Sequence, residues 1–223
     1  MPQCVALAAM ENEYTQFPAL STMAEDHCGI ALVERVLKNH KEAWTPLNHP
    51  TMTLNIRADH ISIERLRNDQ KDMVFSVQSL SNIHPAIMRV ATGSSLPEDV
   101  FYVRPPCKTY QDGNSEPYAW SAEQYEHQLA EARCSALDYL NKIEDGVSTE
   151  HAGGVLISSY LQNAVITGSL RAWIDMLDKR SGPYESFEIK LLIDMIGTHV
   201  QRWAPETFHW WDSHRKFYCL EVA

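Results

Sequence analysis

The second half of the chain carries apolar residues at helical spacing. Leu170, Trp173, Ile174 and Leu177 stand at positions i, i+3, i+4 and i+7 of the stretch from residue 167 to residue 180. This spacing puts the four side chains on one face of a helix that packs against a core. A later segment repeats the pattern at Ile189, Leu192, Ile193, Ile196 and Val200. Both segments are therefore predicted to be amphipathic helices.

Capping residues mark a longer helix between residues 121 and 146. Ser121 can accept a hydrogen bond from the backbone of the first turn, and Gln124 completes a capping box with it. Gly146 is typical of the residue that ends a helix. Ser148 follows closely and predicts the cap of a further helix.

The first half alternates apolar and polar residues. Met52, Leu54 and Ile56 point to one side of an extended chain, and the polar residues between them point to the other. This pattern predicts a half-buried strand. Helices are expected near residues 30–40 and 61–67, a second β-rich segment near 72–81, and a loop over the Pro- and Gly-rich residues 104–117. The predicted fold is α+β, in one domain over residues 1–223, with a mixed or antiparallel sheet in the front half and a helical back half.

Composition and charge argue against several classes of function. The 223 residues carry a net charge of −10, which argues against non-specific binding to nucleic acid. No run of about 18 apolar residues is present, so no membrane span is expected. The five cysteines form no CxxC pair and give no zinc signature, which favours reduced thiols in a cytoplasmic protein without a metal site.

The charged side of the segment over 167–180 has two interpretations. Arg171, Asp175 and Arg180 lie off the apolar stripe. They could form a solvated helix face, where an Arg171–Asp175 pair would contribute about 0.3–0.5 kcal/mol. Alternatively, a few well-placed arginines can create a local positive pocket for a small anionic ligand, even on an acidic chain.

The order of motifs in the back half resembles the flavin-dependent thymidylate synthases. Residues 146–148 match a turn of that family, Tyr160 matches a tyrosine, and residues 184–189 match its last element. The resemblance implies that Ser169, Arg171 and Asp175 contact the flavin. It also implies that Arg180 engages the uracil ring of the substrate.

The front half resembles the same family with changes in its basic motif. Thr45, Pro46 and His49 keep the kernel of one family segment. Aligning Ser79 with the serine of the family hallmark places Asp69, Gln70 and Lys71 on its Arg-His-Arg triplet. Leu80, Ser81 and Gly153 stand where further family residues, basic ones among them, are expected, while Arg65 and Arg67 lie just upstream of the triplet and could supply the missing charge.

The resemblance also implies ligands and roles. The cofactors are FAD, NADPH and methylenetetrahydrofolate, the substrate is a uridine nucleotide, and the assembly is a homotetramer with shared active sites. The implied flavin-binding residues are Thr45, Asp69, Gln70, Lys71, Ser169, Arg171 and Asp175. The implied substrate-binding residues are Arg65, Arg67, Gln78, Ser79 and Arg180, of which Arg180 is catalytic.

The altered triplet indicates a specialised activity. We expect C5-methylation of UMP or dUMP, as in the branch of the family that serves polyoxin-type nucleoside antibiotic pathways. Two alternatives stay open: an ordinary dUMP-to-dTMP synthase in a divergent homologue, for example a viral one, and an inactive relative that binds flavin or nucleotide.

Three further features stay open. Cys107 follows two prolines, as does the nucleophile of the flavin-independent thymidylate synthases, but a structural cysteine in a turn is the other interpretation. His49 could face a nicotinamide or folate, or cap a strand. The aromatic segment 209–218 could be a ligand platform, a docked terminus or a subunit contact.

Overall fold

The computed structural model describes residues 2–11, 25–39, 41–68, 70, 72–106, 108–111, 116–182 and 185–218. Contacts between residues divide the chain into two compact units. Unit 1 comprises Met1–Leu54, Gln70–Val74 and Thr167–Ala223, and unit 2 comprises Asn55–Asp69 and Phe75–Ile166. The single-domain expectation stays a prediction.

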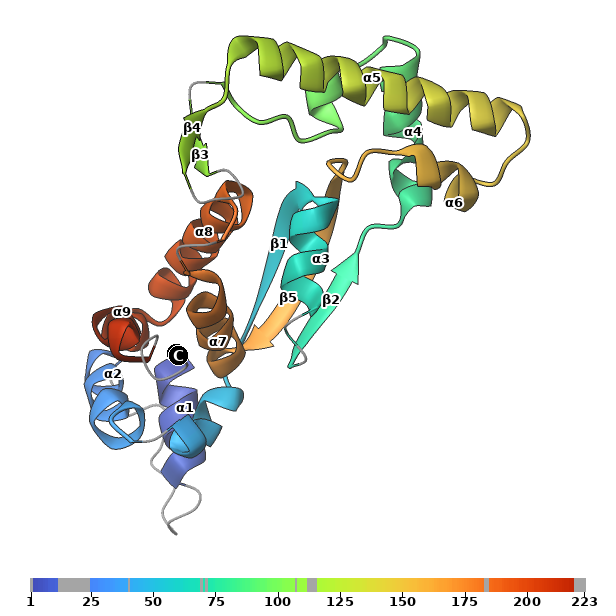
Figure 1. The fold of residues 1–223 in the computed structure, drawn as a ribbon. Coiled ribbons are helices and arrows are strands. Elements are labelled where there is room, and N and C mark those ends of the chain that lie inside the picture. The colour runs from blue at the N-terminus through green and yellow to red at the C-terminus, as the bar shows by residue number, and fades with distance from the viewer. Residues whose placement is uncertain are drawn as a thin grey trace. The chain divides into compact units, whose positions relative to one another are not determined.

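A three-stranded sheet has the order β1-β5-β2 (Figure 1). Its strands are β1 (Thr51–Asp59), β5 (Leu161–Ser169) and β2 (Met73–Val77). Within unit 1, Leu170 donates to the carbonyl of Pro50 (2.9 Å) and the hydroxyls of Thr53 and Thr167 are 2.8 Å apart. These pairs run in opposite directions along the chain, so β1 and β5 are antiparallel. The alternation predicted for β1 is confirmed, since its exposed and half-buried residues alternate.

Unit 2 is built around helices that pack on one another. Its helices are α3 (His60–Asn68), α4 (Leu80–Ala91), η5 (Pro97–Asp99), α5 (Ala122–Glu144), α6 (Thr149–Ala152) and η6 (Gly153–Val155). Figure 1 shows α4 crossing α5 at a steep angle, with α6 close by, and all three pairs of helices are in contact. The predicted capping box is present: Gln124 N donates to Ser121 Oγ (3.1 Å) and Ser121 N donates to Gln124 Oε1 (2.9 Å). Gly146 ends the helix with a positive φ of 82°, as predicted.

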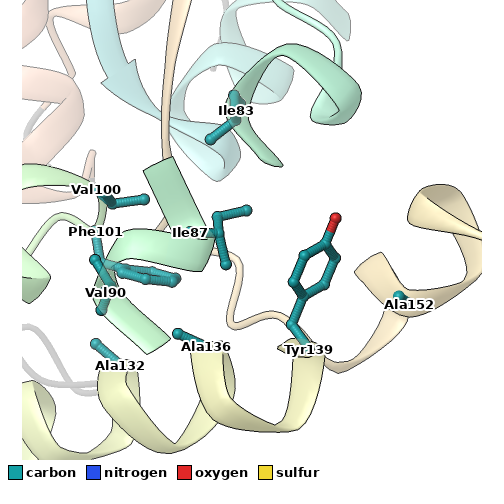
Figure 2. Close-up of a cluster of buried hydrophobic side chains, with 9 residues drawn as sticks. All are labelled: Ile83, Ile87, Val90, Val100, Phe101, Ala132, Ala136, Tyr139 and Ala152. Carbon is teal, nitrogen blue, oxygen red and sulfur yellow. The ribbon is translucent and has the colours of Figure 1, made fainter. Parts of the chain in front are cut away.

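The core of unit 2 lies between α4 and α5. Ile83, Ile87 and Val90 of α4 and Ala132 and Ala136 of α5 belong to one cluster of buried side chains, which Figure 2 shows. Small residues on one helix let the other approach closely, and the buried Phe101 and Tyr139 fill the remaining space. This packing fixes the start of α4, which directly follows the predicted site residues Gln78 and Ser79.

Unit 1 joins helices from both ends of the chain. They are α1 (Pro2–Glu11), α2 (Glu25–Leu32), η3 (Val33–Leu37), η4 (Lys41–Asn48), α7 (Leu170–Arg180), α8 (Phe187–Trp203) and α9 (Pro205–Tyr218). The apolar stripes predicted for α7 and α8 are confirmed, because every residue named for them is buried. In the part of the chain that the structure describes, no helix has an apolar stretch long enough to cross a membrane.

The structure corrects the prediction of a plain loop over residues 104–117. Strands β3 (Thr109–Gln111) and β4 (Pro117–Ala119) form an antiparallel pair there, with Tyr110 opposite Tyr118. Arg104 lies over the rings of Tyr110 and Trp120, at 5.4 and 5.2 Å from their centroids. Cation–π contact and aromatic packing therefore order a segment that its composition marks as a turn.

Candidate functional site

The junction of β5 and α7 in unit 1 forms a cleft that holds predicted site residues. Ser169 is the N-cap of α7 and accepts a hydrogen bond from Ala172 N (3.2 Å). Gly168 precedes it, where a β-carbon would overlap the side chain of Met73. The cleft has a volume of about 630 Å³. It is lined by Asn48, Thr51, Asp72, Val74, Thr167, Gly168, Ser169, Arg171, Ala172 and Asp175.

The charges of this cleft suit a ligand with both anionic and hydroxyl groups. Arg171 lies in the first turn of α7, where the positive end of the helix dipole also favours an anion. Its Nε is 3.9 Å from Asp175 Oδ2, and both side chains are about one-third exposed. The carboxylates of Asp175 and Asp72 can accept hydrogen bonds from hydroxyl or ring N–H groups. Ser169, Arg171 and Asp175 are thus brought together as predicted.

Arg180 lies at the other end of the same helix and is largely buried. Its Nη1 donates to Glu185 Oε1 at 2.7 Å, and the two side chains are 11% and 12% exposed. A charge-assisted bond of this length fixes the direction of the guanidinium. The side chain is therefore held in place at the end of α7 and does not extend into bulk solvent.

The predicted residues Gln78 and Ser79 lie in unit 2, between β2 and α4. Ser79 is the N-cap position of α4, but its hydroxyl is 2.9 Å from Ser81 Oγ and makes no cap bond. Gln78 lines a separate cleft of about 350 Å³. This cleft is lined by Arg57, Gln78, Asn82, Ile83, Ala86, Asp99, Val100, Leu161 and Asn163.

The remaining predicted residues occupy varied positions. Arg65 and Arg67 lie in the last turn of α3, and Arg67 Nη1 is 3.3 Å from Glu64 Oε1 on an exposed surface. Gln70 is 6% exposed, and its Nε2 has no hydrogen-bond partner in the described part of the chain. Thr45 is exposed in η4. Asp69 and Lys71 lie outside the described residues, as does Cys107.

Sequence reasoning missed several polar residues of the two clefts. Asn163 comes from β5, for which no strand was predicted, and Arg57 and Asp99 lie on the same cleft of unit 2. The sequence signal for β5 is weak, because the positions buried in the structure include Gln162 and Gly168, while Leu161 and Val165 are more exposed. Within the described ranges, no three His, Cys, Asp or Glu side chains are grouped so that they could hold a metal ion.

A histidine and a tyrosine stack on each other in unit 2, where His60 begins α3 and Tyr160 directly precedes β5. The rings of His60 and Tyr160 are stacked, with centroids 4.9 Å apart and planes at 14°. Burial raises the pKa of Tyr160, and the nearby charge of Glu64 raises this pKa further. The hydroxyl of Tyr160 therefore stays protonated over the whole range in which enzymes normally work.

Two features that the sequence left open can be described. The segment 209–218 belongs to α9, where Trp210 packs edge-on against Trp44 with centroids 5.6 Å apart, and Trp211 donates to Asp178. Both tryptophans are buried, which supports the docked terminus over the ligand platform. His49 is exposed next to η4, and its role stays a prediction.

Comparison with solved structures identifies a protein of the same fold. The chain has the fold of the UMP/dUMP methylase PolB from Streptomyces cacaoi, whose crystal structure was solved with 5-Br UMP bound. The similarity has a TM-score of 0.67 at 16% sequence identity and covers 93% of this chain and 89% of that one. No curated protein shows significant sequence similarity to this chain.

A family model gives the assignment. The model described as thymidylate synthase complementing protein matches residues 1–206, which is nearly the whole chain. These proteins are the flavin-dependent thymidylate synthases that the sequence motifs resemble. The chain therefore belongs to the flavin-dependent thymidylate synthase family and is a thymidylate synthase-like nucleotide methyltransferase.

Proposed function

We propose that the protein methylates C5 of a uridine monophosphate, UMP or dUMP or both. In this proposal methylenetetrahydrofolate is the carbon donor, NADPH the reductant and FAD the cofactor. One observation carries this proposal. Ser169, Arg171 and Asp175 line a cleft at the N-terminal end of helix α7, and the largely buried Arg180 lies in its last turn. A single rigid element thus presents both sets of groups that the family requires.

The residues of unit 1 fit a flavin dinucleotide. The cleft of about 630 Å³ offers a guanidinium and a helix N-terminus for phosphate, and carboxylates for hydroxyl groups. The buried Nε2 of Gln70 is a donor without an acceptor in the described residues, which favours a ligand beside it. We assign FAD binding to the unit 1 residues Thr45, Gln70, Lys71, Ser169, Arg171 and Asp175 and, from the family resemblance alone, to Asp69. When bound, FAD supplies the hydride chemistry.

Arg180 is the proposed catalytic residue. C5 of uracil is a poor nucleophile until electron density is moved into the ring, and a fixed guanidinium stabilises the negative charge that then develops at the ring edge. Glu185 restricts the orientation of that guanidinium, so little reorganisation is needed during the reaction. The other substrate-binding residues that we propose from the resemblance are Arg65, Arg67, Gln78 and Ser79.

A specialised role is supported by the altered basic triplet. Asp69 stands where the family has an arginine, and a carboxylate there would repel a phosphate. It can accept a hydrogen bond from a sugar hydroxyl, which a ribonucleotide has at the 2′ position and a deoxynucleotide lacks. We therefore propose UMP as a substrate, in nucleoside metabolism such as antibiotic biosynthesis. Strict preference for dUMP would contradict this and would favour the ordinary synthase.

We also propose a homotetramer, as the family resemblance implies. Leu191 and Met195 are one turn apart on α8 and about half exposed, so they form a small apolar pair on the surface of this helix. Subunit contacts would cover them. Measuring the molar mass of the purified protein by light scattering tests this, and a monomer would contradict it.

The enzymatic proposal has a direct test. The purified protein should show flavin absorbance and oxidise NADPH only when methylenetetrahydrofolate and UMP or dUMP are present, with a methylated nucleotide detected by mass spectrometry. Arg180→Ala should lower the rate by about 100-fold or more. Arg202→Ala, at an exposed position of α8, serves as the matched control and should leave the rate unchanged. A protein that binds flavin but produces no methylated nucleotide would be an inactive relative.

A further inference from the structure

The side chain of Gln78 has its orientation fixed by the main chain of β5. Asn163 N donates to Gln78 Oε1 at 3.1 Å, and Asn163 Nδ2 donates to the same oxygen at 3.0 Å. A backbone N–H can only donate, so the atom facing it must be the amide oxygen. The oxygen of Gln78 is thereby used twice within the protein. Its Nε2 group has no acceptor among the described residues, and Gln78 lines the cleft of about 350 Å³.

A second glutamine holds the main chain of Gln78. Gln162 is 5% exposed, and its Nε2 donates to the carbonyl oxygen of Gln78 at 2.8 Å. A carbonyl oxygen can only accept, so Oε1 of Gln162 must face the other way. That atom lies 2.8 Å from His60 Nδ1. Because Oε1 can only accept, His60 must carry a proton on Nδ1.

His60 is itself fixed from two directions. Its ring stacks on Tyr160, and its backbone N–H donates to the carbonyl of Tyr160 at 3.0 Å. The series His60–Gln162–Gln78 is therefore anchored on main-chain groups at each step. It links the start of α3, strand β5 and the segment before α4. His60 sets which atom Gln162 offers, Gln162 holds the main chain of Gln78, and Asn163 sets which side-chain atom Gln78 offers.

We propose that His60 and Gln162 are positioning residues that hold Gln78 as a hydrogen-bond donor to an acceptor oxygen of the nucleotide substrate. This inference rests on the proposed function, since it takes a uridine nucleotide as the ligand of Gln78. Uracil, ribose and phosphate oxygens are all acceptors of this kind. Neither His60 nor Gln162 needs to touch the substrate, because both act through Gln78.

The test compares variants that remove or keep single hydrogen bonds. His60→Phe keeps a ring to stack on Tyr160 but lacks the Nδ1 donor, and Gln162→Met keeps the volume without polar atoms. Each should raise the KM for the uridine nucleotide about tenfold while kcat stays within about threefold, as does the loss of one hydrogen bond in binding. His60→Asn retains an N–H donor near the position of Nδ1 and should restore most of the affinity.

The control and the double variant separate positioning from folding. His84→Phe breaks the 2.9 Å bond to Tyr139 in the core of unit 2, outside this series, and should lower stability without raising KM. Gln78→Met should raise KM as much as His60→Phe does. The double variant Gln78→Met/His60→Phe should be no worse than Gln78→Met, because His60 acts through Gln78. Additive losses, or an unchanged KM in His60→Phe, would overturn the inference.

Binding measurements distinguish this inference from the proposed function. Titration calorimetry with UMP and with uridine gives the affinity of each variant without turnover. A penalty that disappears with uridine identifies the phosphate as the acceptor, and a penalty that persists identifies the base or ribose. If the wild type binds UMP without methylating it, the proposed function fails while the affinities still test the inference. A wild type that binds neither ligand overturns both.

Discussion

Replacing Glu185 by glutamine should weaken both the fold and the activity. Glu185 and Arg180 are nearly nine-tenths buried and their charged atoms are 2.7 Å apart. The substitution removes the negative charge but keeps an oxygen that can accept. Breaking a buried ion pair typically costs about 3–5 kcal/mol, and we expect the lower end, about 3 kcal/mol, because the amide still bonds. For a chain of this length, that corresponds to a fall in Tm of about 6–12 °C.

The measurement is thermal unfolding of the full-length protein, followed by circular dichroism. Glu131→Gln is the matched control, because Glu131 pairs with His127 at 3.4 Å on an exposed face, with side chains 54% and 75% exposed. Exposed pairs contribute little, so the control should change stability by less than about 0.5 kcal/mol. The kcat/KM of Glu185→Gln should also fall, by about 10- to 100-fold, because a neutral amide orients the guanidinium less firmly than a carboxylate does.

Equal effects of the two substitutions would refute this reasoning, because burial would then make no difference to the strength of the pair. If Glu185→Gln lost stability but kept full activity, only the expected fall in kcat/KM would be refuted. In that case the orientation of Arg180 by Glu185 would not matter for the reaction. Charge reversal at both positions gives a further check, since Arg180→Glu/Glu185→Arg should recover part of the stability but no activity.

Three other substitutions have defined outcomes. Gly153→Ala should destabilise unit 2 by at most about 1 kcal/mol in urea unfolding, because a β-carbon there overlaps a terminal methyl group of the half-buried Leu80, which must shift, whereas Gly154→Ala, with open space around it, should be tolerated. Leu80→Ala should remove most of the Gly153→Ala penalty; additive losses would exclude the clash. The raised pKa of Tyr160 contributes stability that is complete below its ordinary value of 10.0 and is lost as pH rises through the raised value. Unfolding of the wild type should therefore become easier above pH 10.0, and Tyr160→Phe should reduce this dependence. Ser121→Ala removes the cap of α5 and should cost about 1 kcal/mol, and an unchanged urea midpoint would mean that the capping box does not stabilise the helix.

Local signals predicted the helices well. Ser121, Gln124 and Gly146 act on backbone groups of their own turn, so their effect can be recognised without knowing the rest of the fold. The stripes of α7 and α8 were equally visible, because helical spacing alone decides which side chains share a face.

Features that depend on distant contacts were harder to predict. The β3–β4 hairpin forms around Arg104 and aromatic rings from both strands, and its turn-rich composition hides this packing. Strand β5 is short of large apolar residues and becomes a strand because β1 and β2 pair with both of its edges. Tertiary context decides such strands more than intrinsic propensity does.

In the candidate site, too, local sequence predicts some features and distant contacts decide others. Ser169, Arg171 and Asp175 share one helical segment, so their common cleft follows from spacing and resemblance together. The contact between Arg180 and Glu185 crosses the end of α7, where the path of the chain decides which groups meet. The His60–Gln162–Gln78 series joins three segments that are distant in sequence, and no local pattern indicates it.

The division of unit 1 between the two ends of the chain has a consequence for synthesis on the ribosome. Unit 2 ends at Ile166, so all of its residues are added to the nascent chain before any of Thr167–Ala223. Unit 1 combines Met1–Leu54 with Thr167–Ala223, so its first helices wait with apolar faces uncovered until that later segment has been made. Such faces attract other chains and chaperones during that delay. A stalled or truncated product should therefore aggregate through its N-terminal helices, although its middle segment has already folded.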